Sequence, residues 1–400
     1  MERRHFLLNS LATATALSAA TPSVRLVTPD EARNRGKLTV GIVGCGRMGQ
    51  YFAEIYRALP DTELVAIAEW NDHRRKVVGE RFGVKALFKD VNAMLRELVP
   101  DLVAVVTPTK FMKEAVIACA EAGVKGVSTD KPIAARLSDA DAMVEACEKR
   151  NIVFAGGNLQ RAMWEVQDVA HRLRTSEYGA LKGVAVHRFG GEISGGGCQH
   201  LSILRLFTGA EVSEVMAWGQ PAEALQQETD EGLDINGVFH MSNGLDCQVF
   251  ARETPYRGVD AWTDNTLVRW DWGAPEIHQS IQGQVSRRKI AANYPPFPWR
   301  YLLDRPTLRA TDNYLVSSIR SFVDVVTAGG NLFVSGHDLR QALEIAIASK
   351  LSAKLGNKPV KLPLEDRSLA LYPRPYRWLG GDATGNPQSG EEATGKMPQA

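Results

Sequence analysis

Residues 38–49 of the chain read Leu38-Thr39-Val40-Gly41-Ile42-Val43-Gly44-Cys45-Gly46-Arg47-Met48-Gly49. A run of strand-forming residues passes into a Gly-x-Gly-x-x-Gly motif, and a helix-like run begins at Gln50. Gly44 permits a tight turn, Gly46 lets the backbone approach a pyrophosphate, and Gly49 lets the helix pack closely on the strand. The free amides and the positive dipole end of that helix would face the phosphates. The motif therefore predicts a dinucleotide-binding turn.

An acidic residue stands at the expected distance from this turn. A second apolar strand, 63–68, ends at Glu69, twenty residues beyond Gly49. A carboxylate at that place accepts hydrogen bonds from the ribose hydroxyls of the adenosine. It favours NAD, because the negative charge would repel the 2′-phosphate of NADP. The nearby segment His73-Arg74-Arg75 leaves NADP as an alternative.

The pattern of the first half alternates strand and helix, which is typical of a parallel sheet covered on both faces. We predict strands at 85–88, 101–106, 126–129 and 152–155, with helices at 72–82, 90–98, 111–122 and 138–150 between them. Ligands bind at the carboxyl ends of such strands. Thr107-Pro108-Thr109 and Asp130-Lys131-Pro132 follow two of these strands directly. The fold class is α/β, with a doubly wound, Rossmann-type dinucleotide-binding domain over 38–158.

The second half has a different pattern. A helix at 163–175 leads into strands rich in Val, Phe and Trp, some of them joined by hairpins such as Ser242-Asn243-Gly244. Hairpin connections indicate a mostly antiparallel sheet. We therefore predict an α+β domain with a large, open, mostly antiparallel sheet over 159–365. The tail, 380–400, is rich in Gly, Glu, Thr and Pro and is predicted to be disordered.

The amino terminus resembles an export signal. Arg3-Arg4-His5-Phe6-Leu7 fits the twin-arginine pattern, and an Ala/Thr/Ser-rich segment follows it. We expect residues 1–30 to be a signal and linker, and the protein to be periplasmic or otherwise extracytoplasmic. Twin-arginine export carries folded proteins, so a cofactor would be inserted before export and held tightly.

Composition excludes several classes of partner. The chain has 47 basic and 46 acidic side chains, which gives no reason to expect nucleic acid or an anionic membrane as a partner. No apolar run approaches the length of a membrane span. The five cysteines are scattered and are expected to be buried thiols, and no histidine or cysteine spacing is typical of a metal site.

Taken in order, these motifs resemble the Gfo/Idh/MocA family, named after glucose-fructose oxidoreductase and inositol dehydrogenase. The resemblance covers residues 38–365, from the glycine motif to Gly336-x-Asp338 and the strand at 360–363. Asp130-Lys131-Pro132 stands where the family usually carries Glu-Lys-Pro. The family implies an NAD(P)-dependent oxidoreductase that acts on CH–OH groups of a sugar or polyol, and a homo-oligomer, dimer or tetramer, formed through the open sheet.

The resemblance, together with the strand ends, gives a set of expected site residues. The expected cofactor-binding residues are Gly44, Cys45, Gly46, Arg47, Met48, Gly49, Glu69, Thr107, Pro108, Thr109, Asp130, Lys131 and Asn158. The expected substrate-binding residues are Lys131, Gln160, Arg161, Gln199 and His200.

Lys131 and His200 are the expected catalytic residues. Lys131 follows a parallel strand, so its amine would project at the ligand-binding edge and stabilise alkoxide character on a substrate oxygen. The family usually places a histidine, its proton-transfer partner, near the start of a helix that here covers 201–207, where Gln199 and the candidate acid/base His200 are adjacent. If the end of the helix is kept in register, Gln199 occupies the histidine position; if histidine is matched directly, His200 does.

These features leave three functional hypotheses. The first is an exported oxidoreductase that transfers a hydride between a carbohydrate and NAD. The second is a redox-neutral glycoside hydrolase or lyase that uses bound NAD transiently. The third is a cofactor-bound protein that has lost catalysis, which the incomplete histidine segment suggests.

Overall fold

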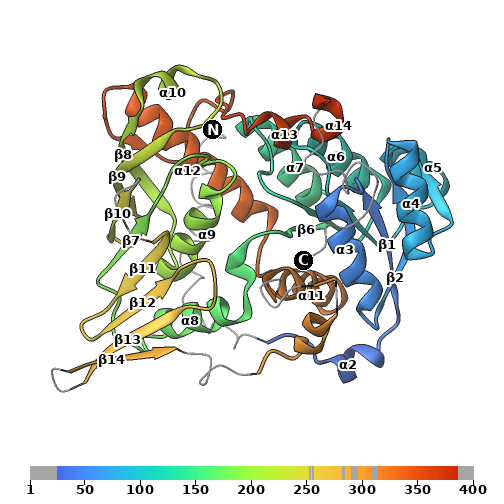
Figure 1. Ribbon diagram of the computed structural model, residues 1–400, viewed down its shortest axis with the longest axis horizontal. Helices are drawn as coiled ribbons and strands as arrows, with labels where there is room; N and C mark the ends of the chain where they lie inside the picture. Colours follow the sequence, from blue (N-terminus) through green and yellow to red (C-terminus); the bar gives the residue numbers. More distant parts are fainter. Residues whose placement is uncertain are drawn as a thin grey trace, which may run out of the picture.

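A computed structural model describes residues 25–251, 254, 256–281, 284–289, 296–305, 307–308 and 313–385 of the chain. It contains two sheets, which lie on opposite sides of the view in Figure 1 with helices between and around them.

The first sheet has six parallel strands in the order β3-β2-β1-β4-β5-β6. Its strands are β1 Leu38–Val43, β2 Thr62–Ala68, β3 Ala86–Phe88, β4 Leu102–Val105, β5 Gly126–Thr129 and β6 Val153–Gly156. This order, which reverses direction at β1, is that of a Rossmann fold. The predicted doubly wound sheet is confirmed, and each predicted strand of 38–158 is present within one or two residues.

Helices cover both faces of this sheet. They are α3 Arg47–Ala58, α4 Asp72–Phe82, α5 Val91–Glu97, α6 Met112–Ala122 and α7 Leu137–Glu148. Local sequence signals set their ends: the Asp90 side chain accepts a hydrogen bond from the Ala93 amide at 2.7 Å and caps α5. Gly123 adopts the left-handed conformation that ends α6.

The second sheet has nine strands in the order β14-β13-β12-β11-β7-β10-β9-β8-β15. Its strands are β7 Gly183–His187, β8 Val212–Gln220, β9 Asp234–Met241, β10 Asp246–Phe250, β11 Gly258–Trp262, β12 Thr266–Trp270, β13 Glu276–Ile281, β14 Gln284–Lys289 and β15 Val360–Lys361. Every pairing is antiparallel except that of β7 with β10, so the predicted mostly antiparallel sheet is confirmed.

One face of this sheet packs on helices and the other faces outward. Along β9, buried and half-buried residues alternate, as expected when only one face is covered. The covering helices are α9 Gly197–Thr208 and α12 Gly336–Lys354, and α8 Trp164–Arg174 packs beside α9. The five cysteines are buried free thiols, as predicted.

A helix from late in the chain completes the first domain. Helix α11, Asn313–Ala328, packs on α3, β5 and β6, and its Phe322 ring lies directly over Gly126. Parallel strands need cover on both faces, and α11 supplies part of that cover. Residues 313–328 therefore contact the parallel sheet, although they fall inside the predicted second domain, 159–365.

The amino-terminal part of the described chain also belongs to the fold. Leu26 is buried, the Val27 amide donates to Asp324 of α11 at 3.1 Å, and α2 covers Pro29–Arg33. The predicted signal and linker, 1–30, thus ends in residues that pack on α11. Residues 1–24, which carry the twin-arginine pattern, lie outside the described residues.

The prediction of a disordered tail from residue 380 is wrong at its start. Helix α14, Gly381–Thr384, follows α13, Pro375–Trp378, and Asp382 forms an ion pair with Arg74. Residues 386–400 lie outside the described residues. In the described part of the chain, no helix is long and apolar enough to cross a membrane.

A buried ion pair joins α11 to the parallel sheet. Arg320 is fully buried and donates to both carboxylate oxygens of Asp61, just before β2, at 2.6 and 2.9 Å. Removing one partner of such a pair leaves an uncompensated buried charge. We expect Arg320→Met to lower the free energy of unfolding by about 3–5 kcal/mol in urea titrations.

Lys149→Met is the matched control, because Lys149 forms an exposed pair with Glu145 and its loss is expected to cost less than about 1 kcal/mol. Equal effects of the two substitutions would contradict a structural role for the Arg320 pair.

Candidate active site

The glycine turn between β1 and α3 has the geometry that its sequence predicts. Gly44 has φ +88°, and a Cβ on it would lie 2.6 Å from the Val106 carbonyl oxygen. A Cβ on Gly49 would lie 2.0 Å from the Gly44 carbonyl oxygen. A Cβ on Gly46 would meet nothing within 4 Å. Gly44 and Gly49 are therefore required by close packing, whereas Gly46 borders open space at the start of α3.

Glu69 lies at the end of β2, beside this turn, and is buried. Its carboxylate accepts hydrogen bonds from the Cys45 amide at 2.7 Å and the Asn71 amide at 3.0 Å. The Arg74 guanidinium lies 3.6 Å away. Each carboxylate oxygen can accept a further bond, so Glu69 retains capacity for ribose hydroxyls.

These residues fit a dinucleotide. The open side of Gly46 lies at the amino terminus of a twelve-residue helix, where amides and dipole favour phosphate. Glu69 is fixed beside it by a backbone amide of the same turn. The Gly44–Gly49 segment would hold the pyrophosphate, and Glu69 the adenosine ribose.

Two further segments reach the same edge of the sheet. Thr107, Pro108 and Thr109 follow β4, and Asp130 and Lys131 follow the neighbouring strand β5. The Thr109 hydroxyl approaches the Pro132 carbonyl at 3.5 Å, which joins the two segments.

Lys131 is half-buried at the end of β5. Its amide donates to the Asp130 carboxylate at 2.7 Å, so the aspartate fixes the backbone of the turn. Burial raises the pKa of the Cys198 thiol, at the start of α9, to about 12, and the Lys131 charge acts in the opposite direction. Lys131 therefore lies near the point where α9 of the second domain meets the parallel sheet.

Gln199 faces the parallel sheet. Its side-chain oxygen accepts from the Gln160 amide at 2.7 Å, and its side-chain nitrogen donates to the Asn158 carbonyl at 3.1 Å. Asn158 follows the end of β6, so these two bonds tie α9 to the strand-end segment.

His200 lies in a different environment. Its ring packs edge-on against the rings of Phe189, Trp270 and Trp272, and among the described residues neither ring nitrogen finds a side-chain or backbone group in hydrogen-bond geometry. Burial, with the charge of Arg257 adding to it, lowers the pKa of His200 to about 3. A neutral imidazole among aromatic rings is typical of a packed core residue. Of the two registers left open above, the contacts favour the one with Gln199 at the family's histidine position.

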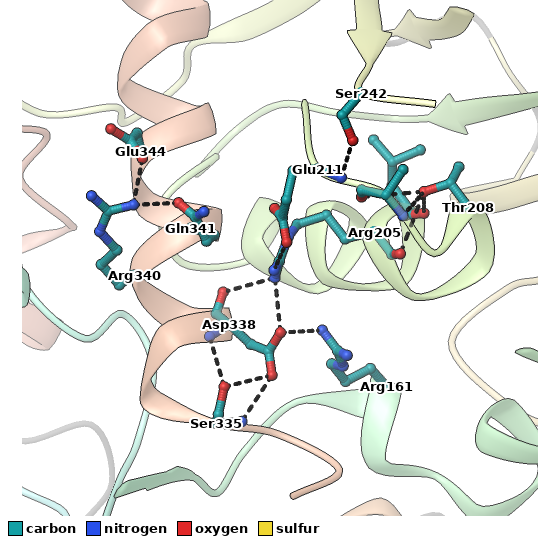
Figure 2. Close-up of polar contacts among 12 residues, drawn as sticks. Arg161, Arg205, Thr208, Glu211, Ser242, Ser335, Asp338, Arg340, Gln341 and Glu344 are labelled. Atoms are coloured by element: carbon teal, nitrogen blue, oxygen red, sulfur yellow. Dashed lines mark hydrogen bonds and ion pairs between the residues drawn. The ribbon is translucent and has the colours of Figure 1, made fainter. Parts of the chain in front are cut away.

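Arg161, predicted to bind substrate, is instead engaged in a buried cluster. Figure 2 shows Asp338 of α12 between Arg161 and Arg205, at 2.7 and 2.9 Å. Burial alone would raise the pKa of Asp338, but the two guanidinium groups hold it well below its usual range. Arg161 thus joins the 160–162 turn to α12 and, through Asp338, to Arg205 of α9. Contact of Arg161 with a substrate stays a prediction.

The structure adds two residues that the sequence did not single out. Arg377 of α13 and Glu192, in the segment before α9, form an ion pair at 2.7 Å. Both charges act on the Cys198 thiol, as do those of Lys131 and Asp130, so each of the four lies within electrostatic range of the start of α9. Glu192 stands in a glycine-rich stretch, which is a weak signal for a site, and Arg377 lies beyond the part of the chain that resembles the family. Among the described residues no group of three metal-ligating side chains is found.

Comparison with known proteins agrees with this geometry. Residues 38–157 match the model of the GFO_IDH_MocA oxidoreductase family, described as having an NAD-binding Rossmann fold. The chain is 24% identical to D-apiose dehydrogenase of Paraburkholderia graminis, over 84% of this chain and 92% of that protein. It is 23% identical to UDP-N-acetylglucosamine 3-dehydrogenase of Acidithiobacillus ferrooxidans, over 79% and 97%.

Among solved structures, levoglucosan dehydrogenase in complex with NADH superposes with a TM-score of 0.69 at 19% identity. The superposition covers 82% of this chain and 99% of that one. The first domain is therefore an NAD-binding Rossmann domain, and the relatives that match most of the chain are dehydrogenases.

Two substitutions in the glycine turn distinguish an effect on NAD binding from an effect on stability. Gly46→Ala adds a methyl group where space is open, so we expect near-normal stability but binding of NAD weakened about tenfold or more. Gly49→Ala forces a methyl group against the Gly44 carbonyl, so we expect a loss of stability of about 1–3 kcal/mol or more. Calorimetric titration with NAD⁺ and thermal unfolding measure the two effects. Normal NAD binding by Gly46→Ala would argue against a pyrophosphate at this turn.

Proposed function

We propose that this chain, whose residues 38–157 match the model of the GFO_IDH_MocA oxidoreductase family, is an NAD-dependent dehydrogenase of a carbohydrate CH–OH group. The observation that carries the proposal is the convergence of the glycine turn, Glu69 and Lys131 on one edge of the parallel sheet. The named activities of the sugar dehydrogenases that match most of the chain support the choice of substrate class.

Bound NAD would accept the hydride that leaves the substrate carbon, and the hydroxyl proton would pass to the Lys131 amine and from there to water as the carbonyl forms. The chain's own task is to hold the substrate oxygen and to stabilise the negative charge that develops on it. The Lys131 amine suits this task, because it projects from the end of β5 beside the start of α9. Asp130 fixes the Lys131 backbone, and the Glu192–Arg377 pair also lies within electrostatic range of Cys198 at the start of α9.

We assign no proton transfer to His200, because its ring has aromatic neighbours and a pKa near 3. Gln199 is proposed to position the Asn158–Gln160 segment at the strand ends. Gln160 remains a candidate for contact with the substrate.

We propose further that the protein acts as a homo-oligomer through the outer face of the nine-stranded sheet. Trp218 on β8 and Phe250 on β10 are 45% and 42% exposed, and both point away from the helices. Large exposed aromatic side chains on an open sheet are typical of an interface. Contact with a second copy of the chain would remove them from water.

Replacement of the lysine tests the catalytic assignment. We expect Lys131→Met to lower kcat by about 10²–10⁴-fold, since the charge on the reacting oxygen loses its partner. The assay follows NADH formation with a panel of sugars and polyols, and NAD binding is expected to stay within about threefold of wild type.

Lys125→Met is the matched control, because Lys125 precedes β5 at the opposite edge of the sheet. Unchanged turnover in Lys131→Met would remove the lysine from the mechanism. Cleavage of a glycoside without net NADH formation would instead identify the redox-neutral hydrolase, and binding without turnover a protein that has lost catalysis.

We also propose export by the twin-arginine route, with NAD bound before translocation. The basis is Arg3-Arg4 and the Ala/Thr/Ser-rich segment that follows. Replacing Arg3 and Arg4 by lysine is expected to retain the protein in the cytoplasm, as cell fractionation would measure. Equal amounts of wild type and variant outside the cytoplasm would contradict the proposal.

A further inference from the structure

The carboxyl-terminal segment, residues 370–385, returns to the dinucleotide-binding edge of the parallel sheet. It first pairs with residues ahead of α7: Ala370 bridges to Arg136, and the Leu371 amide donates to the Ala135 carbonyl at 2.8 Å. Helices α13 and α14 then follow the top of the first domain in Figure 1, above α6 and α7. This segment lies beyond the part of the chain that resembles the family.

Contacts fix the segment along the whole edge. At one end Arg377 pairs with Glu192, near Lys131. In the middle, a Cβ on Gly380 would lie 2.7 Å from the Pro108 side chain, so the two residues are in close contact. At the other end Asp382 reaches the residues that follow β2.

Asp382 is bound by two side chains that lie within five residues after Glu69, those of Asn71 and Arg74. The Arg74 guanidinium contacts its two carboxylate oxygens at 2.7 and 2.9 Å, and the Asn71 side-chain amide approaches at 3.4 Å. Arg74 is buried and also lies 3.6 Å from Glu69. The Arg74 guanidinium therefore lies between the carboxylate of Glu69, which follows β2, and the carboxylate of Asp382 in the carboxyl-terminal segment.

This arrangement bears on the choice between the two nicotinamide coenzymes. Where Glu69 holds the ribose hydroxyls, a 2′-phosphate would enter the space next to them and would need a nearby arginine. Arg74 is the arginine that lies against Glu69, and the Asp382 carboxylate already binds it. Asp382 would thus disfavour the 2′-phosphate in two ways. It occupies the Arg74 guanidinium that would otherwise bind the phosphate, and its own negative charge would repel the phosphate.

We propose that Asp382 is a specificity-determining residue that selects NAD over NADP. The inference rests on the proposed function, since it requires a dinucleotide at the glycine turn. It assigns the carboxyl-terminal segment a role at the adenosine end of the site. It also explains how a chain with Arg74 beside its ribose-binding acid would bind NAD rather than NADP.

The test compares the binding of NAD⁺ and NADP⁺ by calorimetric titration of the full chain, without substrate. We expect Asp382→Asn to tighten NADP⁺ binding about tenfold or more, with NAD⁺ binding changed less than about threefold. Adding Arg74→Gln to this variant is expected to abolish the gain, because the phosphate then lacks its cation. Asp366→Asn is the control, since Asp366 is exposed in the same part of the chain and bonds only Ser368 among the described residues.

Three outcomes overturn the inference while leaving the proposed function in place. In the first, NADP⁺ binding by Asp382→Asn stays as weak as in the wild type. In the second, the binding of both coenzymes tightens equally. In the third, the tighter binding of NADP⁺ persists when Arg74→Gln is added. Equal gains would mean that the segment only obstructs the site. Failure of the wild type to bind either coenzyme is a separate result, which contradicts the proposed function itself.

Discussion

The close approach of α3 to the β1 turn is the constraint on which the rest of the site depends. The Gly49 backbone lies so near the Gly44 carbonyl that no side chain fits, and Gly44 itself presses against Val106 at the end of β4. This packing places the amino terminus of α3 at the carboxyl ends of the parallel strands. It also brings the Cys45 amide within hydrogen-bond distance of the Glu69 carboxylate. The groups proposed to bind the phosphates and the ribose are thus joined by a hydrogen bond, and the neighbouring strands place Lys131 on the same edge.

A second constraint fixes how the nine-stranded sheet meets this edge. Asp338 binds Arg161 of the strand-end segment and Arg205 of α9, so one carboxylate joins three elements from distant parts of the chain. Gln199 adds hydrogen bonds between α9 and the same segment. Together these contacts hold the start of α9, with Cys198, close to Lys131. Through Asp338, Arg161 therefore helps to position the start of α9.

The sequence predicted most of the first domain, because its strands are buried runs and its turns carry residues with a single physical explanation, such as Gly44, Asp90 and Gly123. It did not decide between Gln199 and His200. Neighbouring residues on a helix point about 100° apart, so only the packing of α9 determines which one faces the sheet. The pair of Arg161 with Asp338 and that of Arg74 with Asp382 join residues far apart in the chain, and no local pattern reveals them. For the same reason the polar, glycine-rich carboxyl-terminal sequence predicts disorder from residue 380, whereas an ion pair with Arg74 holds Asp382 of α14.

The central claim is that a nicotinamide dinucleotide lies along the carboxyl edge of the parallel sheet. A crystal structure of the full chain grown with NAD⁺ tests it most directly. We expect the pyrophosphate to lie at the amides that follow Gly46, the adenosine ribose to contact Glu69, and the nicotinamide ring to lie beside Lys131. A dinucleotide bound elsewhere, or an empty edge at saturating NAD⁺, would contradict it.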